Sequence, residues 1–159
     1  MPHYDYIITG AGAAGLSLLM RMIRSEKFAH KKVLLVDKAP KVQNDRTWCY
    51  WEKEKGFFDD LVFSRYQQLW FHANGYSALH NIQPYEYKLI RSIDLYSYCF
   101  DVITKQPNIE IVYGNVEALQ SDATVTRAVV NGETYTAEYI FNSIVFEKPV
   151  MGEGQFYLL

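Results

Sequence analysis

The chain has 159 residues, of which 49% are hydrophobic and 21% are charged, and this composition predicts one globular domain with a sizeable core. The formal net charge of -2 and the isoelectric point near 6.1 argue against nucleic acid as a partner, and no uninterrupted apolar run is long enough to span a membrane. No basic segment precedes the first apolar stretch, as it would in a signal peptide, so we expect a cytoplasmic protein.

The first motif is a short strand that runs into a glycine-rich turn. Residues 6–8 predict a buried strand, and Gly10, Gly12 and Gly15 follow it with the spacing G-x-G-x-x-G. In dinucleotide-binding proteins the first glycine permits the tight turn, the second lets a pyrophosphate approach the backbone, and the third lets the helix pack closely on the strand. The helix that follows would direct its free N–H groups at the phosphates.

A helix and a second strand complete this motif. Apolar residues recur at helical spacing and form a stripe of Leu16, Leu19, Met20 and Ile23. Residues 33–36 are a continuous apolar run, typical of a strand covered on both faces, and the run ends at Asp37. An acid about 20 residues past the glycines can accept hydrogen bonds from both ribose hydroxyls and would repel a 2′-phosphate, which favours FAD or NAD over NADP. The alternative is a helix start rich in glycine and alanine that is merely close-packed.

Cysteines and histidines give no sign of a metal or redox site. Cys49 and Cys99 lie far apart without a C-x-x-C spacing, so we expect two packed thiols and no disulfide. The four histidines show no paired ligand spacing, and we assign no metal.

Residues 44–52 carry two tryptophans in a segment whose polar start predicts a loop. In a functional interpretation Arg46 donates to a phosphate or ribose, while Trp48 and Trp51 line an apolar cavity. In the alternative, a small hydrophobic cluster is closed by a surface pair between Asp45 and Arg46. The residues alone leave both interpretations open.

Residues 66–90 predict a small antiparallel excursion. Two extended segments, 67–73 and 76–80, flank Asn74-Gly75, which is the strongest short signal for a hairpin, and residues 85–90 form a third extended segment.

A second amphipathic helix follows Arg91. Its predicted apolar stripe consists of Leu95, Tyr98, Cys99, Val102 and Ile103. Ser92 is the expected N-cap, and Pro107 marks the exit. At this helix start, Arg91 is either within reach of the phosphates bound by the glycine turn or a solvated surface arginine.

The last part of the sequence predicts a return to the main sheet through a β-meander. Residues 109–113 predict a strand parallel to the first two, 116–119, 123–130 and 133–137 predict the meander, and 139–142 lead back to the parallel sheet. The expected fold is therefore α/β, a Rossmann-like FAD/NAD(P)-binding domain over residues 1–159. Because a meander in the crossover is a feature of FAD-binding two-dinucleotide folds, it favours FAD.

Four segments, in this order, resemble a known family: YDYIITGAGAAGLSLL, VLLVDK, NDRTWCYW and IRSIDLYSYCF. They are similar to the N-terminal part of flavoprotein lycopene β-cyclases, which belong with the p-hydroxybenzoate hydroxylase-like flavoproteins. The resemblance covers nearly the whole chain, and its most specific part is the run DRTWCYW at residues 45–51.

The resemblance implies an FAD site and a reaction. The residues that it places at the flavin nucleotide are Gly10, Ala11, Gly12, Ala14, Gly15, Asp37, Lys38, Arg46 and Arg91, with the backbone of Val116 near the adenine. Relatives convert the linear ends of lycopene to β-ionone rings in carotenoid biosynthesis, an isomerisation without net redox change that uses reduced FAD with NAD(P)H as the reductant. A carotenoid substrate also allows peripheral contact with a membrane.

The chain departs from its relatives in two respects. Asn142-Ser143 stands where relatives commonly carry Asp-Ser or Asp-Ala, and Ile144 after it is unusual. Relatives are also much longer, and their acidic catalytic motif, later Gly-Asp flavin motif and most of their substrate domain lie beyond the position of Leu159. Because residues 156–159 read as a strand in mid-course, we expect an N-terminal part of a longer protein that is inactive alone.

The catalytic residues are therefore unknown, and neither Glu52 nor Glu54 is a credible proton donor. Besides a cyclase, the sequence allows an FAD-dependent reductase or hydroxylase of polyprenyl or aromatic substrates. A non-catalytic nucleotide-binding module is the remaining alternative.

Overall fold

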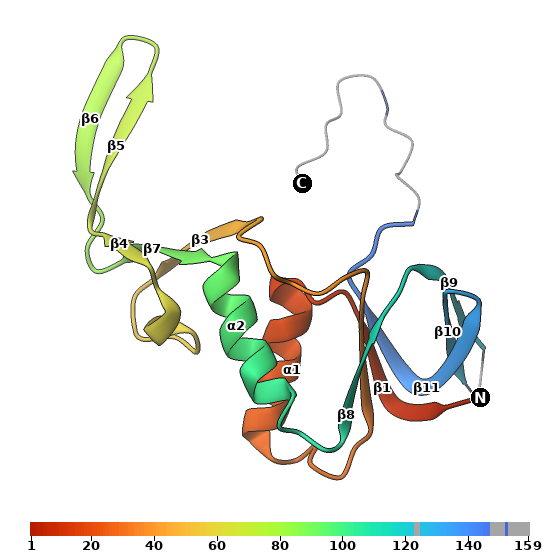
Figure 1. The fold of residues 1–159 in the computed structure, drawn as a ribbon. Helices are drawn as coiled ribbons and strands as arrows, with labels where there is room; N and C mark the ends of the chain where they lie inside the picture. The colour runs from red at the N-terminus through yellow and green to blue at the C-terminus, as the bar shows by residue number, and fades with distance from the viewer. Residues whose placement is uncertain (123–124, 147–151, 153–159) are drawn as a thin grey trace. The chain divides into compact units, whose positions relative to one another are not determined.

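The computed structural model describes residues 1–122, 125–146 and 152 (Figure 1). The chain divides into two compact units. Unit 1 consists of Met1–Lys38 and Asn108–Leu159, and unit 2 is the intervening segment Ala39–Pro107. The strand predicted at residues 156–159 lies outside the described residues.

Unit 1 is built on a six-stranded sheet with the order β8-β2-β1-β11-β10-β9. Its elements are β1 (His3–Thr9), α1 (Ala13–Ser25), β2 (Val33–Asp37), β8 (Ile109–Tyr113), β9 (Val116–Ser121), β10 (Thr126–Val130) and β11 (Glu133–Asn142). Strands β8, β2, β1 and β11 pair in parallel, while β9, β10 and β11 form an antiparallel meander. This arrangement confirms the predicted Rossmann-like α/β fold with a meander in its crossover.

The meander differs from the prediction at its last strand. The two segments expected at residues 133–137 and 139–142 form the single strand β11. The first half of β11 pairs with β10, and from Thr136 to Asn142 the same strand pairs with β1. One strand therefore joins the meander to the parallel sheet without a break.

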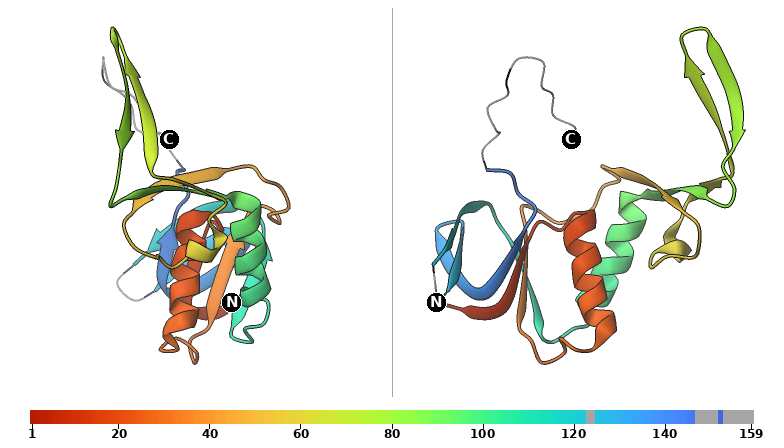
Figure 2. Two further views of the ribbon diagram at one scale, coloured as in Figure 1. Left: turned by 90° about the vertical axis from the view of Figure 1, so that its left-hand side faces the viewer. Right: turned by 180° about the vertical axis from the view of Figure 1, so that it is seen from behind.

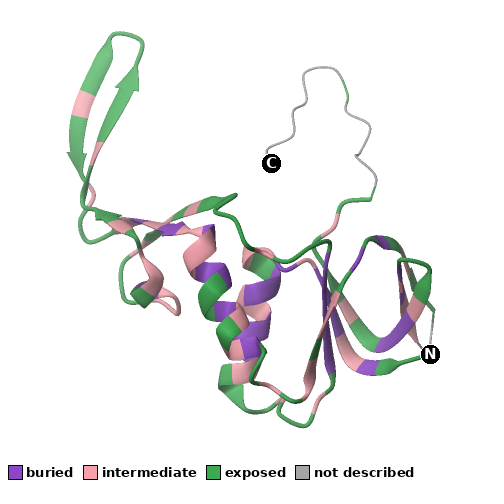
Figure 3. Ribbon diagram, viewed as in Figure 1, coloured by how far each residue is buried: buried purple, intermediate pink, exposed green. Residues whose placement is uncertain are grey.

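Apolar side chains cover the central strands of unit 1. All five residues of β2 are buried (Figure 3), as expected for a strand between two parallel neighbours. Helix α1 buries the predicted Leu16, Leu19 and Met20, but Met22 is buried where Ile23 is only half-buried.

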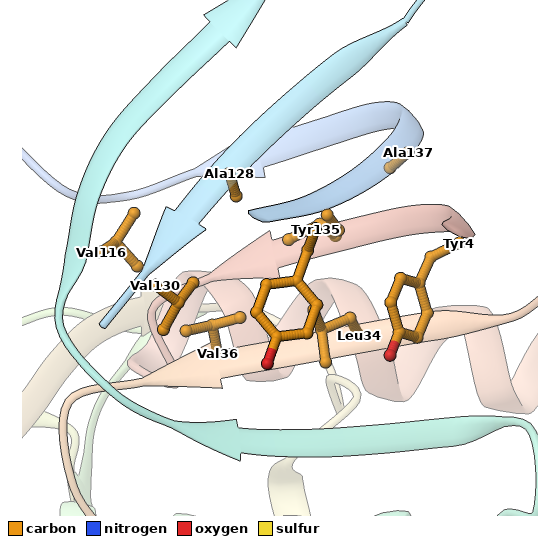
Figure 4. Close-up of a cluster of buried hydrophobic side chains, with 9 residues drawn as sticks. Tyr4, Leu34, Val36, Val116, Ala128, Val130, Tyr135 and Ala137 are labelled. Carbon is orange, nitrogen blue, oxygen red and sulfur yellow. The ribbon is translucent and has the colours of Figure 1, made fainter. Parts of the chain in front are cut away.

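A second cluster joins β1 and β2 to the meander (Figure 4). The rings of Tyr4 and Tyr135 lie 6.4 Å apart in it, and the Tyr4 hydroxyl donates to Glu110 Oε2 at 2.6 Å. Burial, together with this carboxylate, raises the pKa of Tyr4, so its hydroxyl remains protonated and donating. The meander is therefore packed against the parallel strands as well as hydrogen-bonded to β1.

Unit 2 contains two antiparallel sheets and a helix. Its elements are β3 (Thr47–Glu52), the 3-10 helix Asp59–Leu61, β4 (Ser64–Tyr66), β5 (Gln68–Ala73), β6 (Tyr76–Asn81), β7 (Glu86–Arg91) and α2 (Ser92–Ile103). The predicted hairpin is confirmed as β5 and β6, a ribbon that is largely exposed and that Figure 2 shows from two further sides. The third predicted segment is β7, but it pairs with β3 and β4 in a separate sheet of order β3-β7-β4.

Strand β3 was not predicted. The expected loop is confined to residues 44–46, and from Thr47 the chain pairs with β7 along its whole length. Burial alternates along β3, which leaves Cys49 exposed, so the prediction that both cysteines are packed was wrong for this one. Both thiols are free, and burial raises the pKa of Cys99 to about 12.

Two details of α2 also differ from the prediction. Arg91 is the N-cap residue, and Ser92 is the first helical residue, with its hydroxyl accepting a hydrogen bond from the N–H of Arg46 at 3.1 Å. Tyr98 is exposed, whereas Tyr96 is buried, because Tyr96 donates to Asp45 and its ring meets that of Trp48 edge-on at 5.9 Å. The buried face of the helix is therefore rotated from the expected one.

A buried lysine in the three-stranded sheet forms hydrogen bonds to several parts of unit 2. Lys88 on β7 is 1% exposed, and its ammonium donates to Asp59 Oδ1 at 2.7 Å, Glu52 Oε2 at 2.9 Å and the carbonyl of Glu54 at 3.1 Å. Arg65 on β4 binds both oxygens of the same Asp59 carboxylate, at 3.0 and 2.9 Å. Burial opposes the charge on Lys88, but its hydrogen bonds to Asp59 and Glu52 prevail, so the pKa of Lys88 lies above its ordinary value.

The acid stability of the protein should report on Asp59. Its hydrogen bonds to Arg65 and Lys88 hold its pKa at about 2, below the ordinary 3.8. Because the folded pKa is the lower one, this stabilisation is present above the ordinary value and is lost as the pH falls from 3.8 towards about 2. Urea denaturation of wild type and Asp59→Asn across this pH window should show a smaller acid-dependent loss in the variant. Equal losses would mean that other carboxylates dominate.

Candidate functional site

A glycine turn joins β1 to α1 at the carboxyl end of β1. Gly10 has a φ of +102°, which L-residues rarely adopt, and its N–H donates to the carbonyl of Val36 at 2.7 Å. A Cβ at Gly15 would collide with the carbonyl oxygen of Gly10 and would lie 3.2 Å from Ile8 Cγ2. The first and third glycines therefore serve the tight turn and the close helix packing that the motif predicts.

The surroundings of Gly12 are different. Apart from Gly12 itself and its two chain neighbours, no atom of the described residues lies within 4 Å of the place where its Cβ would stand. Gly12 is also the N-cap of α1, and in the described structure no side chain caps this helix start and no acidic residue lies in its first turn. The turn thus presents open space beside the positive end of a helix, which is the arrangement that favours a phosphate.

Asp37 stands directly beside this turn. It is buried at the end of β2, its Oδ2 accepts a hydrogen bond from the N–H of Ala11 at 2.6 Å, and its carbonyl accepts from the N–H of Gly114 at 2.9 Å. The structure therefore brings the acid and the glycines together at the carboxyl ends of parallel strands, where ligands bind in open α/β sheets.

The remaining predicted residues of unit 1 lie around the same sheet edge or next to it. Ala11 is buried, while Ala14, in the first turn of α1, and Lys38, directly after β2, are exposed. Val116 begins β9, and its side chain belongs to the buried cluster of Figure 4.

Two residues of this edge were not predicted to belong to the site. Tyr113, the last residue of β8, pairs in register with Asp37 and is 42% exposed, and burial together with the charge of Asp37 raises its pKa. The hydroxyl of Ser143, which follows β11, donates to the carbonyl of Thr9 at 2.9 Å, next to Gly10. Their signal was positional, since each lies where a strand of the parallel sheet ends.

The two predicted arginines belong to unit 2. Arg46 is exposed, and its carbonyl accepts a hydrogen bond from the N–H of Ser92 at 2.9 Å. Arg91 binds both oxygens of Asp94, with Nε–Oδ2 and Nη2–Oδ1 distances of 2.7 and 2.9 Å, and its guanidinium lies 4.0 Å from the ring centre of Phe63. A phosphate that approached Arg91 would therefore compete with Asp94.

The two tryptophans of β3 face opposite sides of the strand. They are three residues apart in a strand, where side chains alternate, and the burial along β3 alternates accordingly. Trp48 is half-buried against Tyr96, whereas Trp51 is 55% exposed beside Tyr87, with ring centres 5.2 Å apart. The structure therefore does not bring the pair together on one wall.

The described residues contain neither a membrane-spanning helix nor a metal-binding cluster. None of their helices is both long and apolar enough to cross a membrane. No three His, Cys, Asp or Glu side chains in the same residues gather where a metal ion could be held.

The family comparison covers both units. A family model described as lycopene cyclase protein matches residues 5–151, which include the glycine turn, Asp37 and the tryptophan strand. The chain belongs to the lycopene cyclase protein family. The resemblance found in the sequence is thereby confirmed. No curated protein matches the chain.

Solved structures show the same fold at low sequence identity. The p-nitrophenol 4-monooxygenase of Pseudomonas putida DLL-E4 aligns with a TM-score of 0.61, 15% identity, and 88% of this chain and 40% of its own covered. A probable FAD-dependent monooxygenase of Pseudomonas aeruginosa aligns with a TM-score of 0.62 and 17% identity, over 87% of this chain and 41% of its own. An anhydrotetracycline hydroxylase of Streptomyces rimosus aligns with a TM-score of 0.63 and 14% identity, over 87% of this chain and 31% of its own. The lycopene cyclase family chain thus spans less than half the length of these proteins.

Proposed function

We propose that this chain is the FAD-binding part of a lycopene β-cyclase, an enzyme that closes the linear ends of lycopene into β-ionone rings without net redox change. The proposal of FAD as the cofactor rests on the glycine turn, in which the space at the Cβ position of Gly12 is open while the corresponding spaces at Gly10 and Gly15 are filled by protein. Membership of the lycopene cyclase protein family supports the reaction.

The residues of unit 1 fit the adenosine diphosphate half of FAD. Gly12 and the start of α1 would hold the pyrophosphate, because a Cβ-free and uncapped helix start offers N–H donors without steric hindrance. Asp37, already fixed by the N–H of Ala11, would accept from the ribose, and Val116 would contact the adenine through its backbone. Arg46 and Arg91 are proposed as further phosphate partners from unit 2.

The chemistry places few demands on these residues beyond binding. Reduced flavin, with NAD(P)H as the reductant, supplies an electron-rich neighbour for the carbocation that protonation of a terminal alkene creates. The chain's part is to hold the nucleotide in a fixed orientation and to keep its phosphates neutralised. We assign no proton donor to this chain. Because a carotenoid substrate is lipid-soluble, we also propose that the complete protein contacts a membrane surface.

A second candidate is an FAD-dependent hydroxylase of an aromatic or polyprenyl substrate. It is favoured by the solved structures with this fold, which include monooxygenases and a hydroxylase by name. A non-catalytic nucleotide-binding module is the third candidate.

One experiment separates the three. The complete protein is incubated with lycopene and chemically reduced FAD without oxygen, and the products are analysed by chromatography. A cyclase forms a product with β-ionone rings and the same mass as lycopene. A hydroxylase forms no product without oxygen, and once oxygen and NAD(P)H are supplied its product is heavier than the substrate because it has gained an oxygen atom. A module binds FAD but forms no product under either condition.

Replacing Asp37 by alanine should weaken FAD binding in the complete protein. The loss should be about 1–3 kcal/mol, the usual scale for removing one partner of a charged hydrogen bond. Isothermal titration with FAD measures it, and Asp101→Ala on the exposed face of α2 is the matched control. An unchanged affinity in Asp37→Ala would place the ribose elsewhere.

Substitutions in residues 45–51 should separate cofactor binding from turnover. If Arg46 faces the nucleotide and Trp48 the substrate, Arg46→Ala should lose flavin, while Trp48→Ala should keep flavin and lose turnover. Trp51→Ala is the control, because this ring lies on the other face of β3. Flavin absorbance of the purified protein and the lycopene assay give the two readings. Should Arg46→Ala and Trp48→Ala lower only the melting temperature, the segment is structural.

A further inference from the structure

We propose that Asn142 and Ser143, at the end of β11, are positioning residues for the nucleotide-binding turn. They fix the peptide between Thr9 and Gly10, from which the turn to Gly12 starts. The inference rests on the proposed FAD site and adds two residues to it, at the place where the chain departs from its relatives.

Both polar groups of this peptide are held by neighbouring strands. The N–H and the hydroxyl of Ser143 donate to the carbonyl of Thr9, at 3.1 and 2.9 Å. On the other side of β1, the N–H of Gly10 donates to the carbonyl of Val36 at 2.7 Å. The end of β11 and the end of β2 therefore set the plane of this peptide between them.

Asn142 holds Ser143 in this position. Its Oδ1 accepts hydrogen bonds from the hydroxyl of the fully buried Thr9 at 2.7 Å and from the N–H of Ile144 at 2.8 Å. Its Nδ2 donates to the carbonyl of Ile144 at 2.8 Å. The side chain closes a turn around Ser143, and because it donates as well as accepts, an amide satisfies this set of partners while an ionised aspartate does not.

Ser143 and Gly10 are also complementary in shape. A Cβ on Gly10 would collide with the Ser143 hydroxyl, so the serine occupies the space that glycine leaves. The orientation of Gly10, whose φ of +102° is already unusual, is thereby limited by contact as well as by hydrogen bonds. Any movement of this peptide would shift Gly12, which lies two residues further along the same turn.

The first test compares ligands with and without phosphates in Ser143→Ala. Affinities of the complete protein for FAD, ADP and adenosine are measured by titration and by competition with FAD. We expect FAD and ADP to bind about three- to tenfold more weakly, the effect of one lost hydrogen bond, with adenosine unchanged within about twofold. Ser121→Ala is the control, since Ser121 lies at the far end of β9, level with the start of β1 through β10 and β11.

The difference between the affinities for phosphate-containing ligands and for adenosine distinguishes a positioning role of Ser143 from a general contribution to stability. Unchanged affinities for all three ligands would overturn the proposal, and so would an equal loss for all three together with a lower melting temperature. Failure of the wild type to bind FAD or ADP would instead overturn the proposed function.

The second test needs no nucleotide. Gly10→Ala should lower the melting temperature, and because Ser143→Ala removes the hydroxyl that the new methyl would strike, the drop should be smaller by about 2–4 °C in that background. If the decreases in melting temperature of the two single variants added up, within error, to that of the double variant, Ser143 would not constrain Gly10 and the proposal would be wrong.

Discussion

Replacing Lys88 by methionine is expected to lower the free energy of unfolding of unit 2 by about 3 kcal/mol. Lys88 is 1% exposed and uses its three N–H donors on Asp59, Glu52 and a backbone carbonyl. Removing one partner of a buried ion pair costs about 3–5 kcal/mol, since the other charge is left uncompensated in a medium of low dielectric constant. The lower end applies because Asp59 keeps its two hydrogen bonds to Arg65, and because the Glu52 side chain is 29% exposed.

The measurement can be confined to unit 2. All three tryptophans, Trp48, Trp51 and Trp70, belong to it, so urea denaturation followed by tryptophan fluorescence reports its unfolding. Lys53→Met is the matched control, because Lys53 is exposed beside the same cluster and surface substitutions usually change stability by less than about 0.5 kcal/mol. Equal midpoints for the two variants would mean that the buried pair contributes no net stability.

The elements of unit 1 were predictable because local patterns determined them. A four-residue apolar run can be covered on both faces only in a central strand, and residues 33–36 form all but the last position of β2, which lies between β1 and β8. The glycine spacing could be recognised because Gly10 and Gly15 meet steric demands within the turn itself, and the acid because it ends β2 directly after the apolar run. The hairpin β5–β6 followed from Asn74-Gly75 between two extended segments.

The errors lie where partners distant in sequence decide the structure. Strand β3 exists through its pairing with β7, about 40 residues later, and its own sequence alternates too weakly to reveal it. The buried face of α2 contains Tyr96 rather than Tyr98 because Asp45 and Trp48 meet it. A lysine inside an extended run gives no local sign of burial either, since the carboxylates that compensate Lys88 come from Glu52 and Asp59.

The candidate site shows the same difference between residues that a local pattern reveals and residues that depend on partners distant in sequence. The turn and Asp37 were foreseeable from one continuous motif. Asn142 and Ser143 instead bond to Thr9, which is 134 positions before Ser143 in the sequence, because β1 pairs in parallel with β11. Only the register of that pairing, with Thr9 opposite Asn142, shows that the residue after β11 must stand over the glycine.

The same substitution at two glycines three residues apart should have opposite consequences. Gly15→Ala places a methyl group against the carbonyl oxygen of Gly10, and backbone cannot move aside as a flexible side chain can, so we expect a loss of stability of about 1–3 kcal/mol. Gly12 has a φ of -85° and a ψ of -172°, which alanine adopts without strain, and open space at the Cβ position, so Gly12→Ala should fold with wild-type stability. It should nevertheless bind FAD about tenfold more weakly or worse, because the methyl group stands where the pyrophosphate would approach.

Two readings on unit 1 distinguish these outcomes. Native-state hydrogen exchange of the amides in β1 and α1 reports the stability of the turn, and quenching of flavin fluorescence reports binding. Gly132→Ala serves as a further control for stability, since Gly132 has a φ of +79° with open space around it among the described residues, so its substitution costs backbone strain without any collision.

If Gly12→Ala lost as much protection as Gly15→Ala, protein rather than a ligand would fill the space over Gly12, and the turn would be a close-packed helix start. If Gly12→Ala kept both its protection and its FAD affinity, the phosphates would have to bind elsewhere. Loss of affinity with retained protection is the combination that requires a ligand over Gly12, because it separates what the turn does for the fold from what it does for the nucleotide.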